Sequence, residues 1–249
     1  MNPILGCESL TVSRGGREVL RSVSLSFEPG ITAILGPNGA GKTSFFEGLL
    51  DPKSFDMNAV RFRSKLIRSA ARREFYAHVG YLPQSWEHQP GFNVRESVEY
   101  AAWLKGVPAT EVRRATESIL SRTDLSHYAS FKVRTLSGGT KQRVGLAEAF
   151  VHNPSVVLLD EPTVGLDPSQ RSTFRRFLIE NSKNKAIILS THLTDDVEAV
   201  ADRVAIIHQG EVVFNGSVAE LSGYADPLRG ATSRVESGYL AVVETHARR

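Results

Sequence analysis

Residues 36–43 constrain this chain more than any other stretch, because they read Gly-Pro-Asn-Gly-Ala-Gly-Lys-Thr and match the spacing G-x-x-x-x-G-K-[ST]. Glycines let the backbone take conformations that a Cβ atom forbids, so successive N–H groups converge on a phosphate. Lys42 adds a positive charge toward the outer phosphates, and the Thr43 hydroxyl suits a hard Mg²⁺ ion. The loop predicts that the chain binds a nucleoside triphosphate. The residues expected to contact it are Gly36, Pro37, Asn38, Gly39, Ala40, Gly41, Lys42, Thr43 and Ser44.

The segments on either side of this loop have the character that such a loop needs. Residues 31–35 form an apolar run typical of a buried strand, and residues 42–50 read as a helix whose N-terminus favours an anion. An ordinary glycine-rich turn lacks these flanks. Further apolar runs at 156–159 and 186–189 show no alternation, as expected of strands buried on both faces of a parallel sheet. The sequence therefore predicts an α/β fold.

Length and composition set the outer limits. The 249 residues suffice for one large α/β domain and are too few for two complete nucleotide-binding domains. No apolar run approaches 18 residues and the N-terminus lacks a signal-peptide pattern, so we expect neither a membrane span nor an export signal. The single cysteine, Cys7, excludes an internal disulfide and fits a reducing cytoplasm. A net charge of only +3 gives no reason to expect a nucleic-acid partner.

The remaining periodicities divide the chain into a β-rich and a helical part. Residues 10–27 alternate as antiparallel strands do, with Gly15-Gly16 as the turn, and residues 204–216 read as a strand and a closing hairpin. Asn93 and Glu96 make an approximate capping box for a helix that ends at Gly106, and a second helix is expected over residues 108–122.

Two carboxylates follow the apolar run at 156–159. The carboxyl end of a parallel strand opens into the crevice where α/β sheets bind ligands, beside the phosphate loop. Asp160 is expected to hold Mg²⁺, directly or through water, opposite Thr43. Glu161 is then free to polarise the attacking water as a general base. The alternative is an acidic pair that merely ends a strand before a proline turn.

Two further polar residues are candidates for the same crevice. His192 follows the run at 186–189, so its ring is placed to hydrogen bond the γ-phosphate or the attacking water. Gln84 stands between the β-rich and the helical part, where its amide is within reach of the metal or its water. Taken alone, the histidine reads equally as a structural donor and the glutamine as an ordinary residue after a strand.

Residues 136–143, Leu-Ser-Gly-Gly-Thr-Lys-Gln-Arg, form a second glycine-rich entry to a helix. Ser137 is a natural N-cap, and the free N–H groups and the helix dipole make another anion site. The chain has one phosphate-loop lysine, so this second site needs a different triphosphate. The simplest source is the nucleotide of a facing subunit.

These residues, in this order, resemble the ATP-binding subunits of ATP-binding-cassette (ABC) transporters, over nearly the whole chain. The likeness consists of the Walker A loop at 36–43, the Q-loop residue Gln84, the signature at 136–143, the Walker B pair Asp160-Glu161, and His192. Gly165-Leu-Asp167 corresponds to the D-loop. The signature is the family-specific element, since other P-loop ATPases lack it.

The resemblance implies a P-loop NTPase (RecA-like) core with an antiparallel β subdomain and an inserted α-helical subdomain. A single domain is expected over 1–249, with the β subdomain and ATP-binding core at about 1–84 and 144–216, the helical subdomain at about 85–143 and a C-terminal tail at about 217–249. It also implies an ATPase whose two cassettes face head to tail, with ATP and Mg²⁺ between one Walker A loop and the other cassette's signature. The signature residues acting in trans are Ser137, Gly138, Gly139 and Thr140.

The family further implies a separate membrane permease, so the chain is expected in the cytoplasm, peripheral at the inner face of the cell membrane. Residues 92–106 and the tail around residues 236–242 are most similar to bacterial multidrug or antibiotic-type exporter subunits. The alternative is a soluble ABC ATPase that acts on a protein or ribonucleoprotein assembly. Two positions depart from the family pattern. Thr140 replaces the common glutamine of the signature, and Arg14 stands where an aromatic residue usually stacks on adenine.

Overall fold

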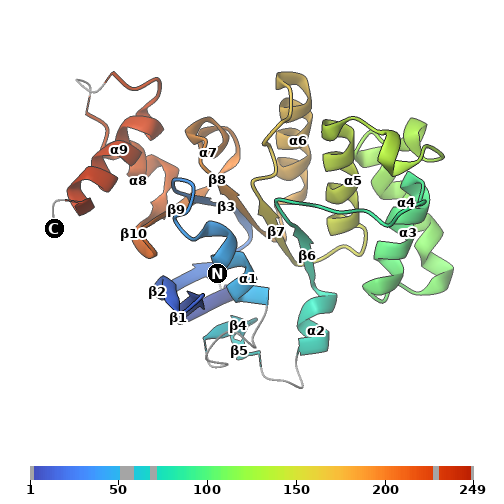
Figure 1. The fold of residues 1–249 in the computed structure, drawn as a ribbon, viewed down its shortest axis with the longest axis horizontal. Helices are drawn as coiled ribbons and strands as arrows, with labels where there is room; N and C mark the ends of the chain where they lie inside the picture. The colour runs from blue at the N-terminus through green and yellow to red at the C-terminus, as the bar shows by residue number, and fades with distance from the viewer. Residues whose placement is uncertain (1–2, 51–58, 68–71, 227–229, 248–249) are drawn as a thin grey trace.

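The computed structural model describes residues 3–50, 59–67, 72–226 and 230–247. In these residues two β-sheets lie against each other with one helix between them, and the other described helices lie beside the larger sheet and at its two ends (Figure 1). The chain is thus a mixed α/β protein, as its sequence predicts.

The larger sheet has six strands in the order β10-β9-β3-β8-β7-β6 in the part of the chain described. The strands are β3 (Gly30–Leu35), β6 (Val79–Leu82), β7 (Val156–Asp160), β8 (Ala186–Thr191), β9 (Arg203–His208) and β10 (Glu211–Ser217). Every neighbouring pair is parallel except β9 and β10, which form the expected closing hairpin. The carboxyl ends of β3, β7 and β8 therefore meet at one edge.

Both faces of this sheet are buried. In β7, Val157 and Leu159 face one hydrophobic core while Val156 and Leu158 face the other. Because each face needs apolar side chains, the strand reads as an unbroken apolar run rather than an alternating one. This confirms the interpretation of the runs at 156–159 and 186–189.

The smaller sheet is antiparallel with the order β2-β1-β4-β5. Its strands are β1 (Leu5–Arg14), β2 (Arg17–Phe27), β4 (Val60–Phe62) and β5 (Lys65–Leu66). Gly15 and Gly16 make the β1–β2 turn with φ of +57° and +77°, conformations that glycine takes at little cost. Helix α1 (Lys42–Leu50) packs between the two sheets through Phe45, Phe46 and Leu49.

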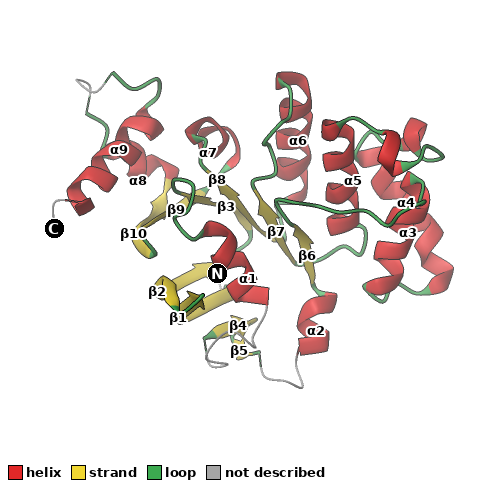
Figure 2. Ribbon diagram, in the orientation of Figure 1, coloured by secondary structure: helices red, strands yellow, loops and turns green. Residues whose placement is uncertain are grey.

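The remaining helices fall into three groups (Figure 2). Beside the larger, six-stranded sheet lie α2 (Arg72–Ala77), α6 (Pro168–Asn181) and α7 (Thr194–Val200). At one end lie α3 (Val94–Leu104), α4 (Ala109–Arg122), the 3₁₀ turns Ser126–Tyr128 and Val133–Thr135, and α5 (Gly138–Phe150). At the other end lie α8 (Val218–Gly223) and α9 (Arg234–Ala247).

The helical end confirms the local predictions made there. Asn93 caps α3, accepting from the Glu96 N–H at 2.9 Å while the Glu96 carboxylate accepts from the Asn93 N–H at 2.7 Å. α5 is one unbroken helix from Gly138 to Phe150, so the expected subdomain boundary at residues 143 and 144 falls inside it. The division into subdomains itself stays a prediction. None of the helices built from described residues is both long and apolar enough to cross a membrane.

Candidate active site

The phosphate loop joins β3 to α1. Gly39 and Gly41 have φ of +80° and +106°, which residues with a Cβ atom rarely adopt. The Nζ atom of Lys42 donates to the carbonyl oxygens of Gly36 at 2.8 Å and Pro37 at 3.1 Å. These bonds fold the lysine over its own loop and hold its charge where phosphate oxygens would bind.

A cavity of about 240 Å³ opens at this loop. It brings together residues far apart in the sequence, namely Val19, Asn38, Gly39, Gly41, Lys42, Thr43, Ser44, Gln84 and Glu161. Gln84 and Glu161 come from the ends of β6 and β7, so the sheet delivers both to the loop, as the sequence analysis expected. Val19 was missed there, because an apolar side chain in a strand carries no sign of a ligand.

The ends of β7 and β8 are tied together by Ser190. Its hydroxyl donates to Oδ1 of Asp160 at 2.5 Å and accepts from the backbone N–H of Glu161 at 2.9 Å. Asp160 is fully buried, and its Oδ2 atom has no hydrogen-bond partner among the described residues. A buried carboxylate oxygen without a donor suits a cation, so Asp160 fits the expected role of a magnesium ligand. The other expected ligands, Thr43 and Gln84, line the cavity together with Glu161, the residue after Asp160.

Glu161 contacts both Lys42 and His192 through its carboxylate. Its Oε1 atom lies 3.1 Å from Lys42 Nζ, and its Oε2 atom lies 2.9 Å from His192 Nδ1. A carboxylate only accepts hydrogen bonds, so the proton of this contact is on Nδ1. Glu161 also has a φ of +49°, a conformation that is costly for a residue with a side chain and that concentrates at functional sites.

The Asp160 carboxylate affects the pKa of Tyr81 on the neighbouring strand β6. Burial is the main cause that raises the pKa of Tyr81 to about 12, and the Asp160 carboxylate raises it further. Tyr81 lies in β6, paired with Leu158 of β7. The phenol thus stays protonated at this edge of the sheet.

The signature begins α5, with Ser137 as its N-cap. Ser137 Oγ accepts from the Thr140 N–H at 3.3 Å and lies 3.0 Å from Thr140 Oγ1. Thr140 also lies 3.4 Å from an Arg143 guanidinium nitrogen, so this departure from the family pattern adds hydroxyl contacts at the helix end. None of Ser137–Thr140 is among the described residues that line the cavity.

The D-loop residue Asp167 caps α6 through a capping box with Gln170. Gln170 in turn lies against Gly139, where a Cβ atom would sit 2.0 Å from Gln170 Oε1. Gln142 of α5 donates to the Pro162 carbonyl at 3.1 Å. The signature helix therefore holds both ends of the segment between Glu161 and α6, a link between distant segments that no local pattern indicates.

Arg14 ends β1, and its guanidinium pairs with the Glu47 carboxylate of α1. Both side chains are about half exposed, at 54% and 42%. Arg14 is not among the described residues that line the cavity. Its proposed stacking on a base stays a prediction.

A phosphate-binding loop between a parallel strand and a helix, facing a buried Asp-Glu pair, defines a P-loop nucleoside triphosphatase. The ABC transporter family model matches residues 20–164. The chain is 33% identical over 221 residues to the Nod factor export ATP-binding protein I of Ralstonia nicotianae, covering 88% of this chain and 68% of that protein. It is 35% identical over 219 residues to the methionine import ATP-binding protein MetN of Caulobacter vibrioides, covering 86% and 66%.

A solved structure supports the same family assignment. cbiO1 of Clostridium perfringens, part of the ABC transporter complex cbiONQ, matches with a TM-score of 0.77 at 28% identity over 90% of this chain and 92% of that one. The chain belongs to the ABC transporter ATP-binding family, whose members bind and hydrolyse ATP. It is an ATP-binding subunit of an ABC transporter, and subunits of this kind work with membrane permease components.

Proposed function

We propose that this chain hydrolyses MgATP to drive a separate membrane permease. The observation that carries the proposal is the position of Glu161, which contacts both Lys42 and His192 beside the phosphate loop. In this assignment Glu161 is the general base for the attacking water, and His192 hydrogen bonds the same carboxylate and orients it. Lys42 binds the outer phosphates, and Asp160, Thr43 and Gln84 hold Mg²⁺, which would stabilise charge on the γ-phosphate.

The proposed working unit is a pair of cassettes, made of two copies or of one copy and a homologue. Ser137 to Thr140 begin a helix outside the cavity, and the N–H groups of Gly138 and Gly139 in its first turn are proposed to bind the nucleotide of a facing cassette. Asp167 belongs to the same surface in this scheme. ATP would close the pair and hydrolysis would reopen it, moving the permease between two states.

The direction of transport is proposed to be export, from the likeness of residues 92–106 to exporter subunits. The similar proteins include one named for export and one named for import. The proposed location is the cytoplasm, at the inner face of the membrane with the permease. The proposed subdomains are a β subdomain and ATP-binding core at about 1–84 and 144–216, a helical subdomain at about 85–143 and a C-terminal tail at about 217–249.

Purification of the tagged chain from membranes in mild detergent tests the permease proposal. The expected result is stable retention of a multi-span membrane protein whose presence increases ATP hydrolysis. A chain recovered only in a complex without membrane proteins would support the alternative, a soluble ABC ATPase acting on a protein or ribonucleoprotein assembly. The proposed direction is tested with inside-out membrane vesicles that contain the complex. An exporter should accumulate its transported solute inside these vesicles when ATP is added outside.

A further inference from the structure

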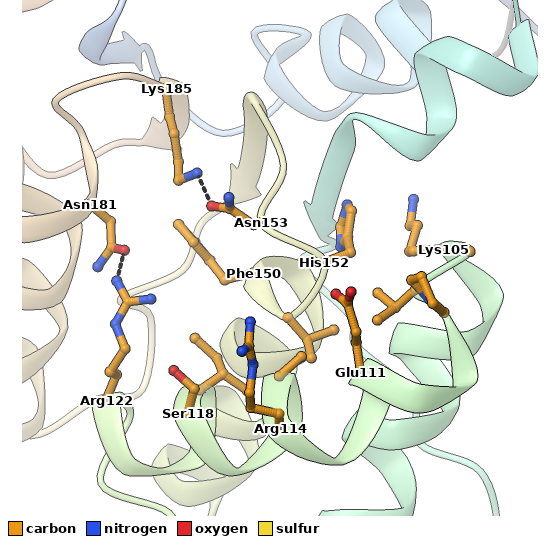
Figure 3. Close-up of a pocket in the computed structure, with 16 residues that line it drawn as sticks. Lys105, Glu111, Arg114, Ser118, Arg122, Phe150, His152, Asn153, Asn181 and Lys185 are labelled. Carbon is orange, nitrogen blue, oxygen red and sulfur yellow. Dashed lines mark hydrogen bonds between the residues drawn. The ribbon is translucent and has the colours of Figure 1, made fainter.

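A cavity of about 820 Å³ lies away from the phosphate loop (Figure 3). Its walls come from α4, the end of α5 and the segments that precede β7 and β8. Asn153 and Lys185 precede these strands, whereas Asp160 and Thr191 end them. The cavity therefore opens at the opposite edge of the sheet from the nucleotide, and it belongs to a different site.

The lining of this cavity is strongly basic. Lys105, Arg114, Arg122 and Lys185 line it, with Glu111 as the one carboxylate among the described lining residues. The formal charge of the lining is thus +3, which equals the net charge of the entire chain. Such a concentration of one sign in a concave surface raises the local concentration of oppositely charged ligands.

The contacts of these cations leave their charge uncompensated. Lys105 Nζ donates to the carbonyls of Tyr76 and Val79 at 3.1 and 2.8 Å, and Lys185 Nζ donates to Asn153 Oδ1 and the Pro154 carbonyl at 2.6 and 2.8 Å. These acceptors are neutral oxygen atoms.

The two arginines complete the set. Arg122 hydrogen bonds Asn181 Oδ1, another neutral acceptor, and Arg114 makes no ion pair or hydrogen bond with any described residue. None of the four cations has a carboxylate within ion-pair distance in the part of the chain described. The fork of Arg114 thus stays open toward a ligand in the cavity.

Burial is the main cause of the pKa shifts in this cluster, and neighbouring positive charges add to it for Lys185 and His152. Burial lowers the pKa of Lys105, and burial with the charge of Arg122 lowers that of Lys185. His152, which lines the cavity and hydrogen bonds the Val79 carbonyl, has its pKa lowered to about 4, first by burial and then by Lys105. Each of these groups would be stabilised in its charged form by an anion.

We propose that this cavity binds a phosphate-bearing anion with an apolar body. Arg114 and Arg122 offer planar forks that match phosphate oxygens, and Val107, Ile119 and Phe150 supply apolar wall. A volume of about 820 Å³ fits the range of small-molecule sites. One wall is formed by α4 and another by Asn181 and Lys185, which precede β8. A ligand in the cavity therefore contacts both the helical end and the larger sheet's side of the chain.

Pyrophosphate is a suitable probe, titrated by calorimetry into a Lys42→Ala chain so that binding at the phosphate loop is weakened. One bound anion per chain is expected. Arg114→Glu combined with Arg122→Glu should weaken binding by about tenfold or more, since two charge-assisted contacts are replaced by repulsion. Arg113→Glu is the matched control, because Arg113 neighbours Arg114 on α4 outside the cavity lining, and it should retain affinity within about twofold.

A second readout is local and uses the unaltered chain. The ring resonances of His152, assigned by their loss in His152→Gln, should shift with pyrophosphate even when the nucleotide site is occupied. Vesicles of phosphatidylglycerol form the second arm, with phosphatidylcholine as the neutral comparison. Binding to these vesicles that the arginine reversal abolishes, without pyrophosphate binding, would identify a lipid headgroup as the source of the phosphate. Absence of binding in both arms, or binding unchanged by the reversal, would overturn the proposal.

Discussion

The Nζ atom of Lys42 lies 3.1 Å from Oε1 of Glu161, and both side chains are 5% exposed. The cation of the phosphate loop is therefore paired with the carboxylate proposed as the general base. A triphosphate that accepts hydrogen bonds from Lys42 draws the cation away from Glu161. Nucleotide binding is thereby expected to free the base at the moment when a water must be polarised.

Replacing Glu161 by glutamine keeps the shape of the side chain and removes its basicity. We expect ATP turnover to fall by about 10²- to 10⁴-fold, the usual contribution of a general base, while ATP binding and closure of the cassette pair are retained. Phosphate release and size-exclusion chromatography with ATP measure the two effects. Glu198→Gln, at an exposed position of α7, is the control. Turnover near that of the unaltered chain would remove Glu161 from the role.

Glu148 of α5 joins the Q-loop to the helical end. Its carboxylate accepts from Trp86 Nε1 at 2.8 Å and from Ser97 Oγ at 2.5 Å. Burial raises the pKa of Glu148 from 4.5 to about 7, against these two hydrogen bonds, which lower it. The folded chain thus keeps a proton that the unfolded chain releases near its ordinary pKa. Between these two values the native state binds more protons, so stability falls as pH rises.

The loss is about 3 kcal/mol across that interval if the whole shift is expressed in the unfolding equilibrium. Urea unfolding at about pH 5 and about pH 8 measures it for the chain and for Glu148→Gln, which cannot titrate. The glutamine variant should show a flatter pH dependence, and Glu180→Gln on the exposed face of α6 should not. Identical slopes in all three proteins would contradict the assignment.

The two signature glycines should respond in opposite ways to alanine. At Gly138 a Cβ atom would meet nothing within 4 Å, so Gly138→Ala should stabilise α5 by up to about 1 kcal/mol. At Gly139 it would meet Gln170 Oε1 at 2.0 Å and displace the residue that completes the Asp167 capping box. Gly139→Ala should therefore be less stable than Gly138→Ala by about 1 to 2 kcal/mol in urea unfolding.

The difference between the two alanine variants should disappear in a Gln170→Ala background, where the obstructing side chain is gone. Its persistence there would mean that Gln170 does not cause the effect.

Arg14 is expected to contribute to nucleotide affinity through its planar guanidinium. Arg14→Ala should weaken ATP binding several-fold, measured by fluorescence titration with Mg²⁺ present. Glu47→Gln separates this role from the ion pair with Glu47, since it removes the pairing charge and leaves the arginine. Unchanged affinity in Arg14→Ala would show that the residue does not stack on the base.

Local patterns predicted much of this molecule. The phosphate loop, the unbroken apolar runs of β7 and β8, and the Asn93–Glu96 capping box each depend on residues a few positions apart. The contacts that sequence reasoning missed join distant positions. Ser190 binds Asp160 across 30 positions and Trp86 binds Glu148 across 62. Neither Ser190 nor Trp86 belongs to a local motif, because the contact that each makes depends on which elements the fold brings together.

The most direct test of the account is equilibrium binding of ATP with magnesium to the purified chain and to Lys42→Ala. Lys42 is the one described cation that combines a place in the phosphate loop with contact to Glu161. We expect saturable binding by the unaltered chain and an affinity lowered by about tenfold or more in the variant, since a buried charge-assisted contact is lost. An unaltered chain that shows no affinity for adenine nucleotides in the presence of magnesium would contradict the account.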